Sequence, residues 1–221
     1  MTMFKKLVLE TWAIIRKPVS AWWLLLALPF LVIVPFDDAA LAHLRFPENS
    51  AAHKVAQVIS SKGDFYNACI VLVLAFWISG LILRRKRLQL LALAMLLSCA
   101  IPGVISLAIR VTTGRPRPSL DVPDGLYGLR FKYNAKFKTQ LPDYDYQSLP
   151  SGHATTAFAT AIPVLVAEPV IGVPLTIAAV SVTWARFQLK RHRLSDLYMG
   201  LLFGSLFGAA FGLAAKKLSP K

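Results

Sequence analysis

The stretch LQLLALAMLLSCAIPGVISLAI at residues 88–109 is followed directly by RVTTGRPRP at residues 110–118. A helix needs about 20 apolar residues to cross the hydrocarbon core of a bilayer. The first stretch is long enough to span a membrane, and the second carries three arginines where that span would reach the membrane surface. Together they indicate an integral membrane protein with a cationic cluster at one membrane face.

The composition of the whole chain supports this interpretation. Of its 221 residues, 56% are hydrophobic and only 16% are charged, whereas a soluble domain usually carries about 25% charged residues. The net charge is nevertheless +14. Intrinsic disorder is excluded, because it combines high net charge with low hydrophobicity. A soluble nucleic-acid-binding protein would explain the charge but not the apolar runs, so we expect no nucleic-acid partner.

Six segments approach the length of a membrane-spanning helix, and we predict an all-α fold, a six-helix transmembrane bundle that forms one domain over residues 1–221. The predicted spans are residues 19–36, 65–83, 88–109, 151–167, 170–184 and 194–215. The fourth and fifth are separated only by Glu168 and Pro169, which predict a tight turn. The loop RRKR at residues 84–87 is short and basic, and such loops stay on the cytoplasmic side. Both termini are therefore expected to be cytoplasmic.

Residues 1–18 predict an amphipathic helix that lies at the membrane interface. At 100° per residue, Phe4, Leu7 and other apolar residues fall on one arc, and most charged residues fall opposite. A solvated basic leader is an alternative, because Leu9 breaks the pattern. A signal peptide cleaved at the A-x-A sequence of residues 40–42 is another. The apolar run exceeds the usual length of roughly 7–15 residues, so a retained anchor is favoured.

The last predicted span carries a stripe of small residues. Its glycines recur every four residues, at Gly200, Gly204, Gly208 and Gly212. On a helix such residues form one face that a neighbouring backbone can approach closely. We favour packing within the chain over homodimerisation, and such packing would hold the start of this helix rigidly.

Three polar clusters interrupt the hydrophobic pattern, at residues 110–118, 150–153 and 186–196. The first follows the third predicted span, the second precedes the fourth, and the third joins the fifth to the sixth. Because consecutive spans alternate in direction, all three clusters lie at one membrane face, which the orientation above makes the external face. A functional site is expected there.

The second cluster is typical of a helix start that binds an anion. Ser151 is a preferred N-cap residue, and the unpaired N–H groups of a helix start attract anions. Gly152 lets the backbone approach an oxyanion closely, and His153 in the first turn is placed to donate a proton. An ordinary capped helix is the alternative.

The third cluster pairs a histidine with a carboxylate. His192 and Asp196 are four residues apart, so they would share one face of a helix. A carboxylate that binds one imidazole nitrogen leaves the other a stronger nucleophile, although a plain surface pair is an alternative. Arg110 and Arg186 lie at span ends, where we expect them to point into the bundle. The other cations are equally typical of a belt that faces anionic headgroups.

The sequence shows no spacing typical of metal ligands, and neither a metal nor another cofactor is expected. His43 and His53 stand alone in the first external loop. Residues 119–149 are expected to form an external, lid-like loop that faces the substrate.

Together the clusters resemble the signature of the type-2 phosphatidic acid phosphatase family of integral membrane phosphatases. The first family motif, Lys-x6-Arg-Pro, is matched by Arg110-x6-Arg117-Pro118, with arginine in place of lysine. The second, Pro-Ser-Gly-His, is matched in full at residues 150–153.

The third family motif is Ser-Arg-x5-His-x3-Asp. It is matched by Arg186-x5-His192-x3-Asp196, with Ala185 in place of serine. Order, spacing and span layout agree over roughly residues 65–215. The resemblance therefore implies a membrane-embedded phosphatase.

The resemblance also implies a mechanism. His192 attacks phosphorus to form a phosphohistidine, Asp196 orients the ring, and His153 protonates the leaving oxygen before water releases phosphate. The implied phosphate-binding groups are Arg110, Arg117, Ser151, Gly152 and Arg186. The arginines would supply the charge stabilisation that a metal gives elsewhere, so no metal is implied.

Family members of this layout act on phosphatidic acid, phosphatidylglycerol phosphate, undecaprenyl diphosphate or lipid A phosphates. The implied partners are thus a phosphorylated membrane lipid and the bilayer, and the implied location is a bacterial inner membrane with the site facing the periplasm. Two alternatives stay open: a phosphotransferase that passes the phosphate to another lipid, and a non-enzymatic lipid transporter.

Overall fold

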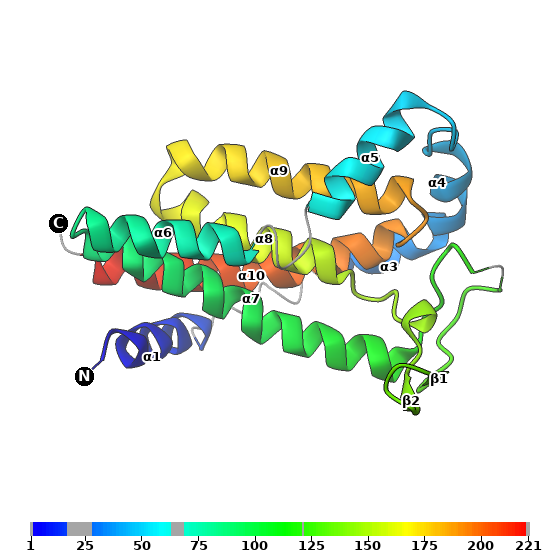
Figure 1. The fold of residues 1–221 in the computed structure, drawn as a ribbon, viewed down its shortest axis with the longest axis horizontal. Coiled ribbons are helices and arrows are strands. Elements are labelled where there is room, and N and C mark those ends of the chain that lie inside the picture. Colours follow the sequence, from blue (N-terminus) through cyan, green and yellow to red (C-terminus); the bar gives the residue numbers. More distant parts are fainter. Residues whose placement is uncertain (1, 17–27, 63–68, 121, 220–221) are drawn as a thin grey trace.

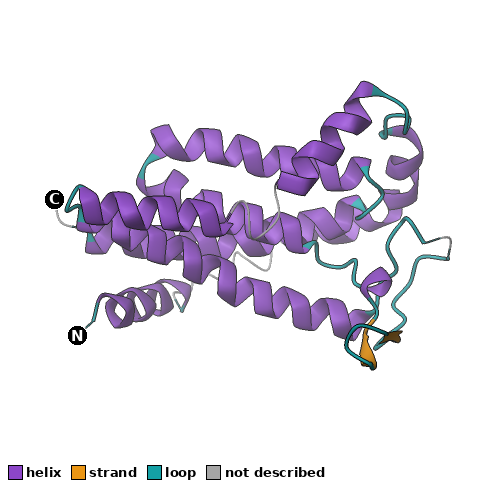
Figure 2. Cartoon of the chain, viewed as in Figure 1, coloured by secondary structure: helices purple, strands orange, loops and turns teal. Residues whose placement is uncertain are grey.

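The computed structural model describes residues 2–16, 28–62, 69–120 and 122–219, and these are mostly helical (Figures 1 and 2). The α-helices are α1 (Met3–Ile15), α3 (Leu28–Ile33), α4 (Asp37–His43), α5 (Ala51–Lys62), α6 (Val71–Ile82), α7 (Lys86–Thr113), α8 (Gly152–Ala167), α9 (Pro169–Gln188) and α10 (Leu194–Leu218). The shorter elements are the 3-10 turns η2 (Val34–Phe36) and η4 (Tyr144–Tyr146) and the strands β1 (Phe131–Asn134) and β2 (Thr139–Pro142).

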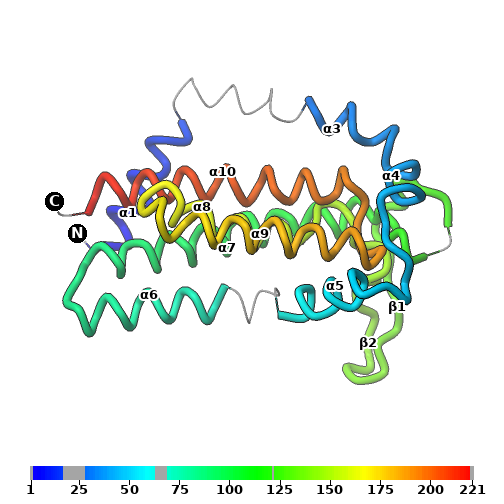
Figure 3. Tube along the Cα trace, turned by 90° about the horizontal axis from the view of Figure 1, so that it is seen from above, coloured from blue at the N-terminus to red at the C-terminus, as the bar shows by residue number. Residues whose placement is uncertain are grey.

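The long helices α6 to α10 lie side by side along the long axis of the molecule (Figures 1 and 3). Among the described residues, three helices are long and apolar enough to cross a membrane, namely α7, α9 and α10. The helices α6 and α8 are apolar but shorter. The predicted spans at residues 19–36 and 65–83 lie partly outside the described residues, so the total of six spans stays a prediction.

The glycine stripe of α10 packs against α8. A Cβ at Gly212 would lie 2.9 Å from the Cα of Pro163, and a Cβ at Gly208 would lie 2.9 Å from the Cβ of Ile162. A Cβ at Gly200 would lie 2.9 Å from the Cβ of Ala154. These separations are below ordinary van der Waals contact, so only glycine permits this approach. The predicted packing within the chain is confirmed, and it fixes the start of α10 against the start of α8.

Replacing Gly204 by alanine is expected to lower the free energy of unfolding by about 1–3 kcal/mol. The new methyl would lie 2.9 Å from the backbone nitrogen of Ala159 and 3.0 Å from the Cβ of Phe158. Gly103→Ala in α7 is the matched control, because a Cβ there meets no described atom within 4 Å. Thermal unfolding in detergent micelles measures both variants. Equal melting temperatures for the two would contradict the packing.

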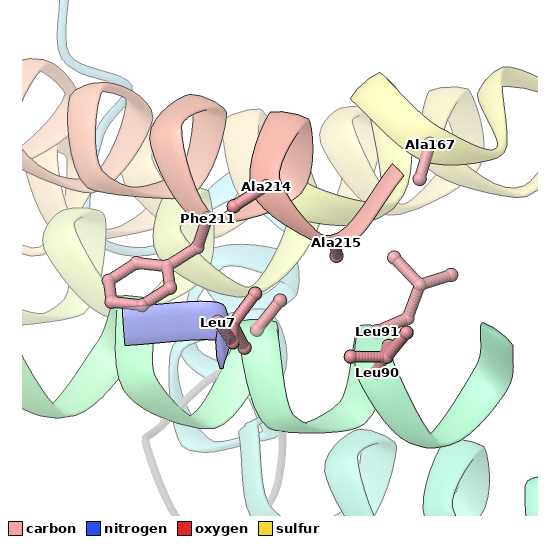
Figure 4. Close-up of a cluster of buried hydrophobic side chains, with 8 residues drawn as sticks. Leu7, Leu90, Leu91, Ala167, Phe211, Ala214 and Ala215 are labelled. Atoms are coloured by element: carbon pink, nitrogen blue, oxygen red, sulfur yellow. The ribbon is translucent and has the colours of Figure 1, made fainter. Parts of the chain in front are cut away.

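A hydrophobic core joins α1, α7 and α10 at the end of the bundle where α7 begins (Figure 4). Leu7 of α1 is fully buried there, in one cluster with Leu91 and Phe211. Phe4, from the same predicted apolar arc, is exposed, and so is Trp12. Within the described part of this segment, Met3–Ile15 is thus helical and packed on the bundle, and its position at the membrane interface stays a prediction.

The predicted first external loop contains two helices that the sequence analysis did not anticipate, α4 and α5. Ala40 of α4 is buried in a cluster with Ala154, Phe187 and Leu197, which lie on α8, α9 and α10. The helix α5 packs against α9 (Figure 1). Both helices therefore cover the end of the bundle where α8 and α10 begin.

The predicted loop at residues 119–149 contains a small antiparallel sheet, so the fold is mostly rather than entirely helical. Phe131 pairs with Pro142 and Tyr133 with Gln140. Aromatic residues favour strands, and in β1 Phe131 and Tyr133 alternate with the polar residues Lys132 and Asn134, which is the period of a strand. The predicted tight turn between the fourth and fifth segments is confirmed, because α8 ends and α9 begins within two residues of each other.

Candidate functional site

The three polar clusters meet at the end of the bundle where α7 ends and where α8 and α10 begin. The backbone N–H of Ser151 donates to the carbonyl oxygen of Asp196 at 2.9 Å, which joins the second cluster to the third. The N–H of Ser148 donates to the carbonyl oxygen of Arg115 at 3.0 Å, which joins the loop before α8 to the first cluster. The predicted convergence of three distant segments is confirmed.

The start of α8 has the predicted cap. The Ser151 side chain accepts a hydrogen bond from the N–H of Ala154 at 3.4 Å. A Cβ at Gly152 would collide with the guanidinium of Arg110, whose Cζ would lie 3.1 Å from it. Glycine therefore lets Arg110 lie directly over the helix start. A guanidinium next to the positive end of a helix dipole is an arrangement that attracts an anion.

His192 is buried, and both of its ring nitrogens have defined neighbours. Its Nδ1 lies 2.9 Å from the carbonyl oxygen of Ser148, and its Nε2 lies 3.4 Å from Nη1 of Arg117. A carbonyl oxygen only accepts and a guanidinium only donates, so Nδ1 carries the hydrogen and Nε2 carries the lone pair. The imidazole is thus held in the tautomer whose Nε2 can act as a nucleophile.

The predicted hydrogen bond between His192 and Asp196 is wrong. The two residues do not share a helical face, because α10 begins only at Leu194. Asp196 instead accepts hydrogen bonds from the Ser148 hydroxyl at 2.6 Å and from the N–H of Arg193 at 2.9 Å. Since the carbonyl of the same Ser148 binds the imidazole, Asp196 is linked to His192 through Ser148 rather than directly.

Arg115 is a buried member of the first cluster whose role the sequence analysis did not predict. Its guanidinium lies 2.7 Å from Asp196, 2.6 Å from Asp124 and 2.9 Å from Asp37. Asp37 also accepts from the N–H of Ser195 at 2.9 Å and binds the Ser195 hydroxyl. Burial alone would lower the pKa of Arg115, but the three carboxylates outweigh burial and raise it. Arg115 thus joins the start of α4 and the loop at residues 119–149 to the start of α10.

Replacing Arg115 by alanine is expected to lower the free energy of unfolding by about 3–5 kcal/mol, because the carboxylates of Asp37 and Asp196 would stay buried without their cation. The double variant Arg115→Ala/Asp37→Asn should recover part of this loss, since it removes one of the uncompensated charges. Thermal unfolding in micelles checks both. An Arg115→Ala protein that melts like the wild type would contradict this account of the network.

The arginines of the site fall into two groups. Arg115 and Arg193 form ion pairs with carboxylates. Among the described residues Arg110, Arg117 and Arg186 form none, although Arg117 is only 2% and Arg186 only 7% exposed. Arg117 donates instead to three backbone carbonyls, and the Nε atoms of Arg110 and Arg186 have no partner in the described part of the chain. Positive charge gathered without facing carboxylates favours the binding of an anion.

The same cluster shifts two pKa values. Burial lowers the pKa of His192 well below its ordinary value of 6.5, and the charges of Arg117, Arg186 and His153 lower it further. Burial also lowers the pKa of Arg117 to about 10, and repulsion from Arg186 and Arg191 acts in the same direction. Because Coulomb interactions fall with distance, these effects place members of all three clusters near His192. His192 is therefore neutral at neutral pH.

The burial of a neutral His192 makes the stability of the protein depend on pH. The unfolded chain binds a proton at this residue below pH 6.5, whereas the folded chain does not until the pH is much lower. The free energy of unfolding should therefore fall as the pH drops below 6.5, by up to about 1.4 kcal/mol per pH unit.

His192→Asn tests this pH dependence, because the amide can still donate to Ser148 but does not titrate. Melting temperatures measured above and below pH 6.5 should differ more for the wild type than for the variant. If the two proteins show the same difference in melting temperature, the pH dependence of stability arises from groups other than His192.

A cavity of about 410 Å³ opens beside the cluster, between α7 and α8. Its polar lining comes from Arg110, Gly152 and His153. The rest of its wall is formed by Cys99, Ala100, Gly103, Val104, Leu107 and Thr156. The cavity thus joins charged groups of the site to apolar faces of two helices. No group of three or more His, Cys, Asp or Glu side chains in the described ranges is arranged to hold a metal ion.

Comparisons with known proteins agree with the sequence motifs. No curated protein matches the chain. Among solved structures it is similar to that of a transmembrane PAP2-type phosphatidylglycerolphosphate phosphatase from Bacillus subtilis, with a TM-score of 0.56 and 16% identity over 98% of this chain and 96% of that chain. At this identity the likeness concerns the fold. The family model described as PAP2 superfamily matches residues 87–219, which include all three motifs and more than half of the sequence, and the chain belongs to this superfamily.

Proposed function

We propose that the chain is a membrane lipid phosphatase that releases phosphate from a monoester or diphosphate headgroup at the external membrane face, through a phosphohistidine intermediate. Membership of the PAP2 superfamily supports a phosphatase for phosphorylated lipids in general. One observation carries the finer proposal. The Arg117 guanidinium lies 3.4 Å from Nε2 of His192, and the charges of Arg110 and Arg186 both act on Arg117. None of these three arginines has a carboxylate partner among the described residues.

In the first step, Nε2 of His192 forms a bond to phosphorus while the bond from phosphorus to the leaving oxygen breaks. His153 donates a proton to that oxygen, so the alcohol or the shortened lipid phosphate leaves without gaining charge. Charge on the transferring group is spread over its equatorial oxygens, which preorganised donors stabilise. The proposed donors are Arg110, Arg117, Arg186, Ser151 and the N–H of Gly152.

In the second step, water attacks the phosphohistidine. His153, now neutral, takes the proton from the water, the bond between nitrogen and phosphorus breaks, and phosphate leaves. His192 returns to its neutral form with Nδ1–H still bound to the Ser148 carbonyl. Its low pKa supports this cycle, because it keeps Nε2 unprotonated between turnovers.

Asp196 and Arg115 serve this site as positioning residues. Asp196 holds the Ser148 side chain, and the Ser148 carbonyl fixes the imidazole tautomer. Arg115 in turn holds Asp196 at 2.7 Å. The guanidinium groups supply the positive charge that a metal ion gives other phosphatases, so the proposed reaction needs no metal.

A phosphorylated lipid suits the cavity between α7 and α8. Its wall carries apolar residues such as Val104 and Leu107, and its polar lining carries Arg110 and His153. A lipid could place a hydrocarbon chain along the apolar wall and its phosphate beside the cluster. The candidate substrates are phosphatidic acid, phosphatidylglycerol phosphate, undecaprenyl diphosphate and lipid A phosphates; the structural relative named above is a phosphatidylglycerolphosphate phosphatase.

The proposed orientation has both termini in the cytoplasm and the site facing the periplasm of a bacterial inner membrane. The basic residues 84–87 join α6 to α7 at the end of the bundle opposite the site, and Lys216 and Lys217 lie at the end of α10. Basic residues at short loops and helix ends favour the cytoplasmic side, which supports this orientation.

The test is a panel of the candidate lipid phosphates, each presented to the purified protein in mixed micelles, with free phosphate as the readout and His192→Ala as the control. We expect the wild type to release phosphate from at least one lipid, with or without a chelator. The His192→Ala variant should release none. Phosphate that appears only on an acceptor lipid would favour a transferase. Lipid movement that survives in His192→Ala, without phosphate release, would favour a transporter. Full inhibition by the chelator would refute the metal-free reaction.

A further inference from the structure

Residues 129–142, here called the basic hairpin, contain both strands of the small sheet and the turn between them. Its sequence, LRFKYNAKFKTQLP, holds four basic residues and no acidic residue. The antiparallel register pairs Phe131 with Pro142 and Asn134 with Thr139. The hairpin is thus a defined structural element whose charge is entirely positive.

Most apolar residues of the basic hairpin are exposed. The exposed fractions are 59% for Leu129, 56% for Phe131, 61% for Tyr133 and 62% for Phe137. The lysines of the turn and strands are exposed as well. An isolated two-stranded hairpin with bare aromatic side chains is only marginally stable in water. Its composition instead suits the membrane–water interface, where aromatic rings sit at headgroup level.

The hairpin lies where such an interface would be. It projects sideways from the bundle at the level of the last turn of α7 (Figures 1 and 3). The helix α7 is long and apolar enough to cross a membrane, so its last turn approaches the membrane surface. We therefore expect the side of the bundle at that level to face the lipid headgroups.

We propose that the basic hairpin docks onto an anionic lipid surface, with its aromatic side chains among the headgroups and its lysines against lipid phosphates. Charge complementarity selects this partner, because each lysine near an anionic leaflet favours binding by roughly fivefold. Of the four basic residues of the hairpin, only Lys132 forms an ion pair with a described residue, Asp145 at 3.7 Å, and both of these side chains are exposed.

Docking would also stabilise the segment of the site that positions Arg117. The strand β2 leads directly into η4, where the carbonyl of Asp145 accepts from the N–H of Arg117 at 2.8 Å. The carbonyl of Tyr144 accepts from Nε of Arg117 at 3.0 Å, and the Arg117 guanidinium lies over the Tyr144 ring. A hairpin fixed to the membrane would therefore hold the segment that positions Arg117. The inference concerns membrane docking and stands independently of the proposed reaction.

The test is hydrogen–deuterium exchange of the intact protein in nanodiscs of neutral phosphatidylcholine and in nanodiscs that also contain phosphatidylglycerol. We expect amides of the basic hairpin to exchange at least about fivefold more slowly in the anionic nanodiscs, and high salt should remove the difference. Peptides from α5, at the same end of the bundle, are the internal control and should not change.

The variant Lys132→Gln/Lys136→Gln/Lys138→Gln should lose the lipid dependence of exchange while α7 and α10 exchange as in the wild type. The variant Phe137→Ser should lose part of the lipid dependence of exchange. Equal exchange in the two kinds of nanodisc, whether fast or slow, would overturn the proposal. If protection of the hairpin from exchange rises with protein concentration, the hairpin contacts another copy of the chain instead, and this result would also overturn the proposal.

Discussion

Replacing His192 by asparagine is expected to reduce phosphate release from the preferred lipid by at least about 10⁴-fold, because the loss of a nucleophile removes the covalent route itself. Asparagine keeps a donor for the Ser148 carbonyl and has no nucleophilic nitrogen, so the surrounding contacts should persist. The measurement is kcat for phosphate release in mixed micelles.

His43→Asn is the matched control for this variant. His43 is an exposed histidine of α4, and the same substitution there should leave kcat within about twofold of the wild type. A His192→Asn protein that is folded and retains more than about one-tenth of the wild-type kcat would exclude His192 as the nucleophile.

Replacing His153 by glutamine is expected to slow release from an alkyl phosphate by about 10²–10⁴-fold, the usual contribution of a general acid. With an aryl phosphate, whose leaving group needs no proton, the rate of the first step should fall far less. Glutamine also cannot take a proton from water, so the second step should become the slow one. Stopped-flow measurement with an aryl phosphate should then show a burst of phenolate followed by slow turnover.

The control compares the two substrates within the same variant, which removes any general effect of folding. A uniform loss on alkyl and aryl phosphates, without a burst, would show that His153 does not donate the proton. Wild-type and His43→Gln proteins should show the same ratio of alkyl to aryl activity.

The large features of the fold could be predicted because they follow from short patterns. The apolar run of α7 and the glycine stripe of α10 need only local composition to be recognised, and the structure bears out both. The meeting of the three clusters followed from counting alternating helices. The family assignment followed from motifs that the family model also covers.

The details of the site depend on where elements begin and end, which sequence patterns fix poorly. The predicted contact of His192 with Asp196 assumed a continuous helix, but α10 starts between them. Asp37 lies far from the motifs in the sequence, so its link to Arg115 at 2.9 Å had no local signal. The repeated Arg-Pro pair at residues 115–118 is the one sequence feature that indicates two arginines with a role at this place.

Arg115 and Arg117 differ in the groups that their charges meet. Arg115 satisfies three carboxylates, and its raised pKa reflects them. Arg117 meets only carbonyls, a ring and the imidazole, and burial lowers its pKa to about 10. Both are arginines followed by proline, so sequence alone does not distinguish the cation that holds the scaffold from the cation proposed to hold substrate.

The most direct test of the central claim is to trap the phosphorylated protein. His153→Gln should be mixed with an aryl phosphate labelled at phosphorus, quenched in alkali during the burst, digested and analysed for the labelled peptide. The account predicts close to one phosphate per chain on the peptide that contains His192, stable to alkali and lost in acid, as expected of a bond between nitrogen and phosphorus. Steady phosphate release without label on this peptide, or label on any other residue, would contradict it.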